Sequence, residues 1–177
     1  MPCTLPKERL DETIRFHGHH CPGLTIGIRA VELAERELGD LAQIDLVAVS
    51  ETDMCGVDAI QFLTDCTLGK GNFIHRDYGK RAFSFYDRKS GKGFRALLKD
   101  LAPGDRSREQ AINHFMTIEL DDMFDLTPLE ALAPRPAQVL ESLRCEHCGE
   151  MTMESRTRRF AGKTYCIPCF SEIDQKL

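Results

Sequence analysis

The 177-residue chain has no tryptophan, few aromatic residues and no long hydrophobic run. No segment approaches the ~18 consecutive apolar residues that a membrane-spanning helix needs, so we expect no association with a membrane. The N-terminal residues Met1 to Thr4 lead into a charged stretch and not into an apolar one. A secretory signal peptide is therefore not predicted.

The chain also has no excess of basic over acidic residues. Lysine and arginine total 23 against 28 aspartates and glutamates, which gives a net charge of −5. From Cys145 onward the two signs balance at five each, so the preceding part carries the whole excess of negative charge. Because nucleic-acid binding requires clustered Lys and Arg around phosphates, this composition does not favour nucleic acid as the partner.

The eight cysteines include two Cys-x2-Cys pairs near the C-terminus, Cys145 with Cys148 and Cys166 with Cys169. Two such pairs separated by 17 residues are typical of a structural zinc site with four thiolate ligands. A segment of ~30 residues cannot build its own core, so bound zinc would supply the folding energy. Two disulfides are the alternative, but thiols held by metal in a reducing cytoplasm are the simpler interpretation.

We therefore predict a cytoplasmic protein with two domains. The first is a core domain over residues 1–138, and the second is a four-cysteine zinc-binding domain over residues 139–177. The hydrophobic residues, 42% of the chain, are sufficient for a real core in the first domain.

A second group of metal-binding side chains lies near the N-terminus. His17, His19 and Cys21 alternate along the chain, so in an extended or looping segment their side chains would face one cavity, with His20 facing away. Pro22 suits the first position of a following helix, which places Cys21 at the N-cap, where the helix dipole favours thiolate. Since Zn, Fe and Ni all accept imidazole and thiolate, the pattern predicts a core transition-metal site without fixing the metal. A surface loop with a buried, inert cysteine is the alternative.

Four further residues extend this candidate site. Cys55 precedes a predicted helix and could act as a ligand or, like Cys21, as a catalytic thiol, and Asp58 in that helix could act as a general base. Cys66 lies eleven residues later, about 16 Å along a straight helix, so it joins only if the chain folds back. A small buried hydrophobe is the alternative for both cysteines. Lys70, in a glycine-rich loop that departs from the Walker pattern, could bind an anionic ligand.

Hydrophobic periodicity and turn residues predict the secondary structure of the core. The predicted helices cover residues 7–15, 22–38, 57–64 and 107–116, and the predicted strands cover 44–49, 81–87 and 93–98. Four small residues, Gly23, Gly27, Ala30 and Ala34, share one face of the second helix. Such a face predicts close packing against another backbone, and a partner subunit is one candidate.

Two blocks of sequence together resemble the FmdE family, which is named after a component of formylmethanofuran dehydrogenase. The first block is His-Gly-His-x-Cys-Pro-Gly from His17 to Gly23, and the second runs from Cys55 to Asn72. The cysteine tail resembles the zinc-ribbon or treble-clef-like domain that many members carry. The resemblance implies an α+β core with a mixed or antiparallel sheet and an intertwined homodimer. It also implies a core cavity, lined here by His17, His19, Cys21, Cys55 and Cys66.

The resemblance does not transfer the dehydrogenase activity, because that reaction is attributed to molybdenum or tungsten pterin chemistry on other subunits. Our leading hypothesis is a dimeric metal-binding protein that is accessory to molybdenum or tungsten redox enzymes, and whether it is itself an enzyme stays open. One alternative is a stand-alone metalloenzyme that uses the core site for hydrolytic or redox chemistry. Another is a metal-responsive regulator that contacts nucleic acid through basic residues of its tail, namely Arg156, Arg158, Arg159 and Lys163.

Overall fold

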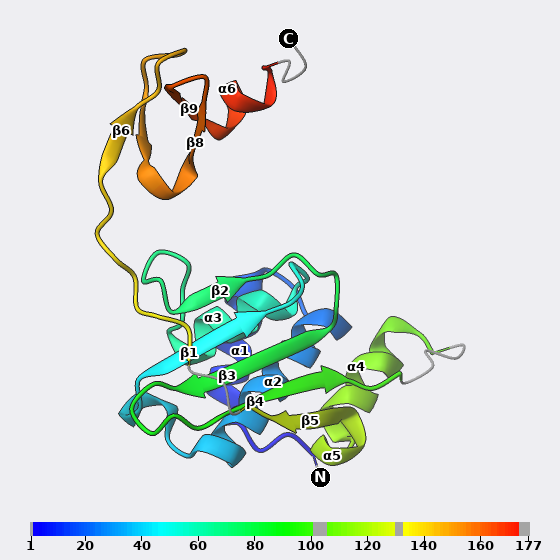
Figure 1. The fold of residues 1–177 in the computed structure, drawn as a ribbon. Helices are drawn as coiled ribbons and strands as arrows, with labels where there is room; N and C mark the ends of the chain where they lie inside the picture. Colours follow the sequence, from blue (N-terminus) through cyan, green and yellow to red (C-terminus); the bar gives the residue numbers. More distant parts are fainter. Residues whose placement is uncertain (1, 101–105, 130–132, 174–177) are drawn as a thin grey trace. The chain divides into compact units, whose positions relative to one another are not determined.

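The computed structural model describes residues 2–100, 106–129 and 133–173. Its contacts divide the chain into two compact units, residues 1–137 and 138–177 (Figure 1). The first unit holds a five-stranded sheet with helices, and the second holds two short β-ribbons and a terminal helix.

The sheet of the first unit has the strand order β2-β1-β3-β4-β5. Strand β1 runs parallel to β2 and antiparallel to β3, and the remaining pairs, β3 with β4 and β4 with β5, are antiparallel. The mixed sheet together with the helices confirms the predicted α+β class. The strands are β1 (Leu46–Ser50), β2 (Phe73–His75), β3 (Ala82–Asp87), β4 (Gly93–Leu98) and β5 (Phe124–Pro128).

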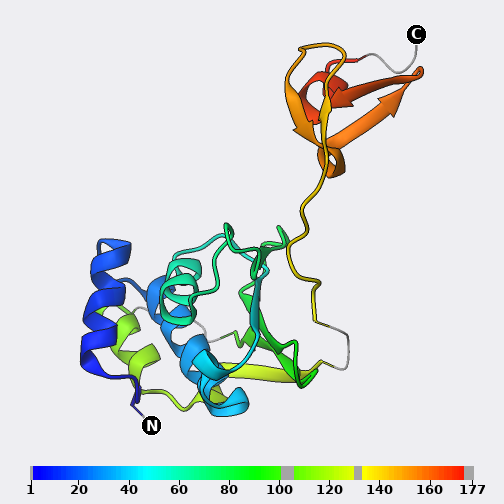
Figure 2. The ribbon, with the colours of Figure 1, turned by 90° about the vertical axis from the view of Figure 1, so that its left-hand side faces the viewer.

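The helices of the first unit lie on one side of this sheet (Figure 2). Helix α2 is the most buried of them, because every residue from Leu24 to Ala34 is buried. It begins with Pro22 at its first position, as predicted, and Gly39 follows it with φ 82°. The helices are α1 (Lys7–His17), α2 (Pro22–Leu38), η1 (Leu41–Gln43), α3 (Gly56–Thr64), α4 (Arg108–Thr117) and α5 (Leu120–Met123).

Two residues of the small-residue face of α2, Gly23 and Gly27, pack against the start of α3 within the first unit. A Cβ added to Gly27 would lie 2.2 Å from the carbonyl oxygen of Gly56. A Cβ added to Gly56 would lie 3.0 Å from the carbonyl oxygen of Gly23. Only glycine permits two helix backbones to approach this closely. The close packing was predicted correctly, but at these glycines the neighbouring backbone belongs to the same chain and not to a partner subunit.

The second unit is built from short elements joined in pairs. Strand β6 (Ser142–Arg144) pairs with β7 (Met151–Met153), and β8 (Thr157–Phe160) pairs with β9 (Lys163–Cys166), both antiparallel. The chain then enters α6 (Ile167–Ser171). A short 3-10 turn, η2 (Glu154–Arg156), separates the two ribbons.

None of the helices within the described ranges is long and apolar enough to cross a bilayer.

Candidate metal centres

The four tail cysteines meet at one point in the second unit. Their sulfur atoms all lie within 4.8 Å of one another, and the Sγ atoms of Cys148 and Cys166 are 3.9 Å apart. Thiolates bound at ~2.3 Å around a tetrahedral Zn²⁺ are about 3.8 Å apart, so the spacing fits zinc. The four-thiolate site predicted from the sequence is therefore present as a geometric cluster.

Backbone N–H groups in the second unit stabilise the thiolate form of Cys145. The N–H of Cys166 donates to the Sγ of Cys145 over 3.3 Å. Hydrogen bonds from backbone N–H groups, first that of Cys166 and then that of Cys148, lower the pKa of the Cys145 thiol to about 6. Because the thiolate is the form that binds metal, these backbone hydrogen bonds favour metal binding by Cys145 at neutral pH.

The core cluster joins His17, His19 and Cys21. One ligand atom from each residue lies within 4.8 Å of those of the other two, and the Nε2 of His17 is 3.9 Å from the Sγ of Cys21. The expected extended geometry is wrong for His17, because this residue is the last of helix α1. Gly18, at φ 91°, turns the chain in the left-handed region, and the side chains converge across that turn.

Cys21 caps helix α2 as the sequence predicted. Its Sγ accepts the backbone N–H of Leu24 over 3.3 Å, and its backbone is extended. The thiol is 7% exposed, whereas His19 is exposed and His17 is intermediate. The three donors therefore form a group that is closed on the Cys21 side and open to solvent at His19.

Asp58 contacts the far side of the His17 ring. Its Oδ2 lies 2.7 Å from the Nδ1 of His17, which leaves the Nε2 of the same ring facing Cys21. Sequence reasoning selected Asp58 as a general base and missed this contact. Two residues 41 positions apart carry no local signal that they will meet.

Cys55 lies beside this cluster but is not among the residues whose ligand atoms converge within 4.8 Å. Its Cβ and Sγ lie 3.2 and 3.7 Å from where a Cβ on Gly23 would be, and it packs with Cys21 in one hydrophobic cluster. Burial, followed by its contact with the Cys21 thiol, raises the pKa of the Cys55 thiol. Cys55 is thus placed as an additional thiol next to Cys21, at the start of helix α3.

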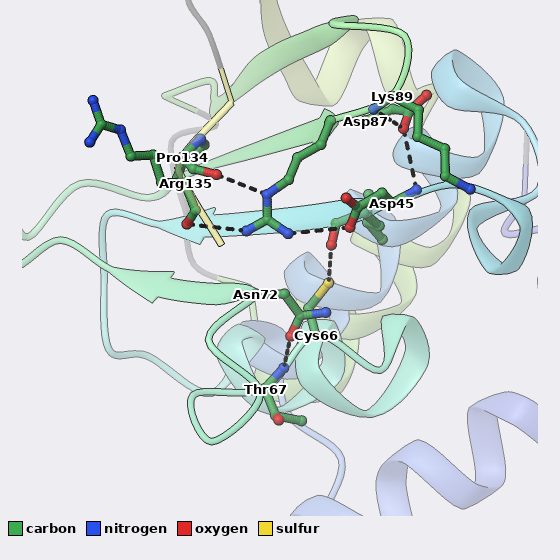
Figure 3. A network of polar contacts seen from close by, with 10 residues as sticks. Asp45, Cys66, Thr67, Asn72, Asp87, Lys89, Pro134 and Arg135 are labelled. Carbon is green, nitrogen blue, oxygen red and sulfur yellow. Dashed lines mark hydrogen bonds and ion pairs between the residues drawn. The ribbon is translucent and has the colours of Figure 1, made fainter. Parts of the chain in front are cut away.

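Cys66 does not join the cluster. Its side chain is fully buried in the main hydrophobic core, and its thiol donates to the backbone carbonyl of Leu46 over 3.5 Å (Figure 3). Burial raises the pKa of this thiol. The chain does fold back after α3, but this turn places Cys66 in the hydrophobic core, next to Leu46 of β1. Cys66 therefore acts as a small buried side chain.

Lys70 also lies apart from the cluster. Its Nζ donates to the backbone carbonyl of Asp65 over 3.1 Å and lies 3.8 Å from the Asp65 carboxylate. The residue lines a polar cleft of about 450 Å³ together with Arg9, Glu35 and Asn72. The structure thus places Lys70 at this cleft and outside the group of His17, His19 and Cys21.

His20 is not part of the converging group of His17, His19 and Cys21. Its Nε2 pairs with the hydroxyl of Thr25 over 3.0 Å, and its backbone carbonyl accepts a hydrogen bond from Arg108 of α4 over 2.9 Å. Burial, with the positive charge of Arg108 as the second cause, lowers the pKa of His20. Sequence reasoning did not identify Arg108 as a neighbour of this loop.

An exposed aromatic pair flanks the site, and sequence reasoning missed it too. Phe16 precedes His17, and Phe62 follows Asp58 by one helical turn; their rings stack with centroids 5.2 Å apart. Phe16 is 57% exposed and Phe62 is 36% exposed. Apolar rings left in contact with water beside a polar cluster mark this surface as a candidate contact site.

Comparison with known proteins assigns the two units separately. The family described as FmdE, molybdenum formylmethanofuran dehydrogenase operon, matches residues 16–125. The family described as prokaryotic DksA/TraR C4-type zinc finger matches residues 140–175.

Two individual proteins are similar over most of this chain. A probable S-adenosyl-L-methionine-binding protein from Archaeoglobus fulgidus is 29% identical over 190 aligned residues, which cover 86% of this chain and 52% of that protein. The chain thus spans about half the length of this curated relative. A crystal structure of a tungsten formylmethanofuran dehydrogenase FmdE-like protein from Syntrophus aciditrophicus matches with a TM-score of 0.69 and 26% identity, over 94% of this chain and 93% of that one.

The FmdE match spans more than half of the chain and includes both His17 and Cys55, and the zinc-finger match includes all four tail cysteines. The chain therefore belongs to the FmdE family and carries a C4-type zinc finger at its C-terminus.

Proposed function

We propose that this protein binds two metal ions per chain at unlike sites, a structural zinc in the tail and a transition metal in the core. The observation that carries the core site is the convergence of His17, His19 and Cys21, whose ligand atoms lie within 4.8 Å of one another. Two imidazoles and a thiolate suit Zn, Fe or Ni, and three protein ligands leave a coordination position open.

The core residues divide into three roles in this proposal. His17, His19 and Cys21 hold the metal, and Cys55 supplies a further thiol beside Cys21, either as a fourth ligand or as a group facing the open position. Asp58 acts through His17. A metal bound here would supply Lewis acidity or redox chemistry, whereas a closed four-thiolate site, such as that of the tail, is structural.

The physiological role that we propose is accessory to molybdenum or tungsten redox enzymes. Support comes from the family description and from the FmdE-like relative, which is named for a tungsten formylmethanofuran dehydrogenase. We further propose that the chain acts as a homodimer. The exposed Phe16–Phe62 stack beside the site supports that proposal, since burying such rings favours association.

A stand-alone metalloenzyme is the second candidate, and one observation favours it. His19 is exposed while Cys21 is buried, so the open position would face solvent and a small substrate could reach it. The first test of this candidate is turnover of formyl, ester or thiol substrates by the metal-loaded wild type. Loss of that turnover in Cys55→Ser would place the thiol in the reaction, and no turnover with zinc, iron or nickel would remove the candidate.

Anomalous scattering tests the core site and identifies its metal. Crystals grown without added metal would be measured at the iron, nickel and zinc absorption edges. We expect one peak among the four tail sulfurs at the zinc edge and a second peak beside the His17 Nε2 and the Cys21 Sγ. A tail peak with no core peak, also after soaking with each metal, would contradict the proposal.

A further inference from the structure

We propose that Asp58 is a positioning residue that fixes the tautomer of His17, so that His17 offers Nε2, and not Nδ1, to a metal. This inference rests on the proposed function of the core cluster and deepens it. It replaces the general-base role that the sequence suggested for Asp58.

The hydrogen-bond geometry determines which nitrogen is available. The Oδ2 of Asp58 lies 2.7 Å from Nδ1, and the Sγ of Cys21 lies 3.9 Å from Nε2. An ionised carboxylate can only accept hydrogen bonds, so Nδ1 must carry the proton. A neutral imidazole has one such proton, and Nε2 is therefore left with its lone pair directed at the side where Cys21 lies.

The fold supports this orientation from both helices. His17 ends α1, and Asp58 lies in the first turn of α3. The Phe16–Phe62 stack joins the same two helices one residue before His17 and one turn after Asp58. The ring of His17 is consequently held between a fixed acceptor on α3 and the cluster itself.

Asp58 is not placed as a ligand. Among the described residues, the group whose ligand atoms converge within 4.8 Å contains His17, His19 and Cys21 and does not include Asp58. The Oδ2 of Asp58 already contacts the Nδ1 of His17, whereas it is the Nε2 of that ring that faces Cys21. Carboxylate partners of this kind orient metal-binding histidines and raise their basicity, and losing one weakens metal binding by about 10- to 100-fold.

Three substitutions separate positioning from simple packing. Asp58→Ala removes the acceptor, whereas Asp58→Asn keeps an oxygen that can accept from Nδ1–H and removes only the charge. Asp65→Asn is the matched control, because it removes a carboxylate that is 91% exposed at the other end of α3. Asparagine tolerates the left-handed backbone of that position, where φ is 57°.

The test has a readout that needs no core metal. Long-range ¹H–¹⁵N spectra of the full chain at pH 8.5, assigned with His17→Gln, report the tautomer of His17 directly. We expect the Nδ1–H tautomer in the wild type, Asp58→Asn and Asp65→Asn, and a shift towards Nε2–H in Asp58→Ala. A wild-type His17 that carries its proton on Nε2 would overturn the inference.

Metal affinity is the second readout. In Co²⁺ titrations against a competing chelator, we expect Asp58→Ala to bind about 10- to 100-fold more weakly than the wild type. Asp58→Asn should recover most of that loss, and Asp65→Asn should match the wild type. Wild-type affinity in Asp58→Ala would overturn the positioning role. If the wild type binds no Co²⁺ in its core, the proposed function fails, while the tautomer spectra still decide the role of Asp58.

Discussion

Gly27 of α2 lies directly against the backbone of Gly56 of α3, so that a Cβ on Gly27 would meet the Gly56 carbonyl oxygen at 2.2 Å. The residues just before Gly56 and just before α2 are Cys55 and Cys21, the two thiols at the core site. The glycine contact therefore sets the distance between the two helix starts that carry the site. The packing of α2 against α3 and the spacing of the Cys21 and Cys55 thiols therefore depend on the same pair of glycines.

Gly27→Ala should consequently destabilise the protein and displace α3 from α2. An added methyl group cannot fit against a backbone atom without moving a helix, and overpacking of this kind costs about 3 kcal/mol or more. Chemical denaturation would measure the loss. Gly69→Ala is the control, since no heavy atom lies within 4 Å of its added Cβ. A Gly27→Ala protein as stable as the control would contradict the close contact.

The ion pair of Glu51 and Arg95 predicts a pH-dependent contribution to stability. The guanidinium of Arg95 donates to both carboxylate oxygens of Glu51, over 2.6 and 2.8 Å. These hydrogen bonds are the main cause that lowers the pKa of Glu51. A pKa that is lower in the folded state gives stability that is present above the unfolded pKa and lost as the pH falls through the folded one.

Glu51→Gln should therefore flatten the acid side of the stability profile, measured by urea unfolding between pH 7 and pH 3. Arg95→Met should cost about 2 kcal/mol at pH 7, because it leaves a buried carboxylate without its charged partner. That cost should shrink towards acid pH as Glu51 becomes protonated. An Arg95→Met penalty that stays constant over this range would show that the pair contributes only packing.

Arg88 holds the segment just before the boundary between the two units. Its side chain donates to the carbonyls of Pro134 and Arg135 over 2.8 and 3.4 Å and contacts the carboxylate of Asp45 at 3.2 Å (Figure 3). Arg88→Gln should release this segment, so that proteinase K cleaves residues 133–141 about tenfold faster, in line with the loss of hydrogen bonds to a charged donor. Lys89→Gln, which changes an exposed neighbour in the same turn, should leave the cleavage rate unchanged. Equal rates in both variants would exclude the anchoring role.

Much of the fold could be predicted from local signals. Pro22 and Gly39 bound α2, the hairpin of β3 and β4 follows from its two apolar runs, and Ser107 with Gln110 forms the predicted capping box. Strand β2 was missed, because its three residues are specified by parallel pairing with β1 and not by their own pattern. Strand β5 was missed as well, since its alternating run is only four residues long and ends at Pro128, which argues against a strand.

In the candidate sites, too, some features follow from local sequence and others depend on the tertiary fold. Both groups of candidate metal ligands contain closely spaced residues, so their members could be selected from the sequence. The placement of Cys66 could not, because a buried thiol and a metal ligand look alike without the surrounding fold. The contact between Asp58 and His17 depends on the packing of α1 against α3, which no local pattern specifies.

The tail zinc should be separable from the core. Cys145→Ser removes the thiol whose pKa the backbone lowers most, and with it one of four ligands. Because a small zinc domain folds only with its metal, we expect the ¹H–¹⁵N signals of residues 138–173 to collapse while those of the first unit stay in place. A tail that keeps its dispersed signals in this variant would show that zinc does not supply its fold.

Metal stoichiometry tests the two-site account most directly. Elemental analysis of the full chain, reconstituted with Zn²⁺ and freed of excess metal, should give two ions per wild-type chain, one in Cys21→Ser, one in Cys145→Ser and none in the double variant. A wild type that holds one ion, unchanged by Cys21→Ser and lost with Cys145→Ser, would contradict the core site.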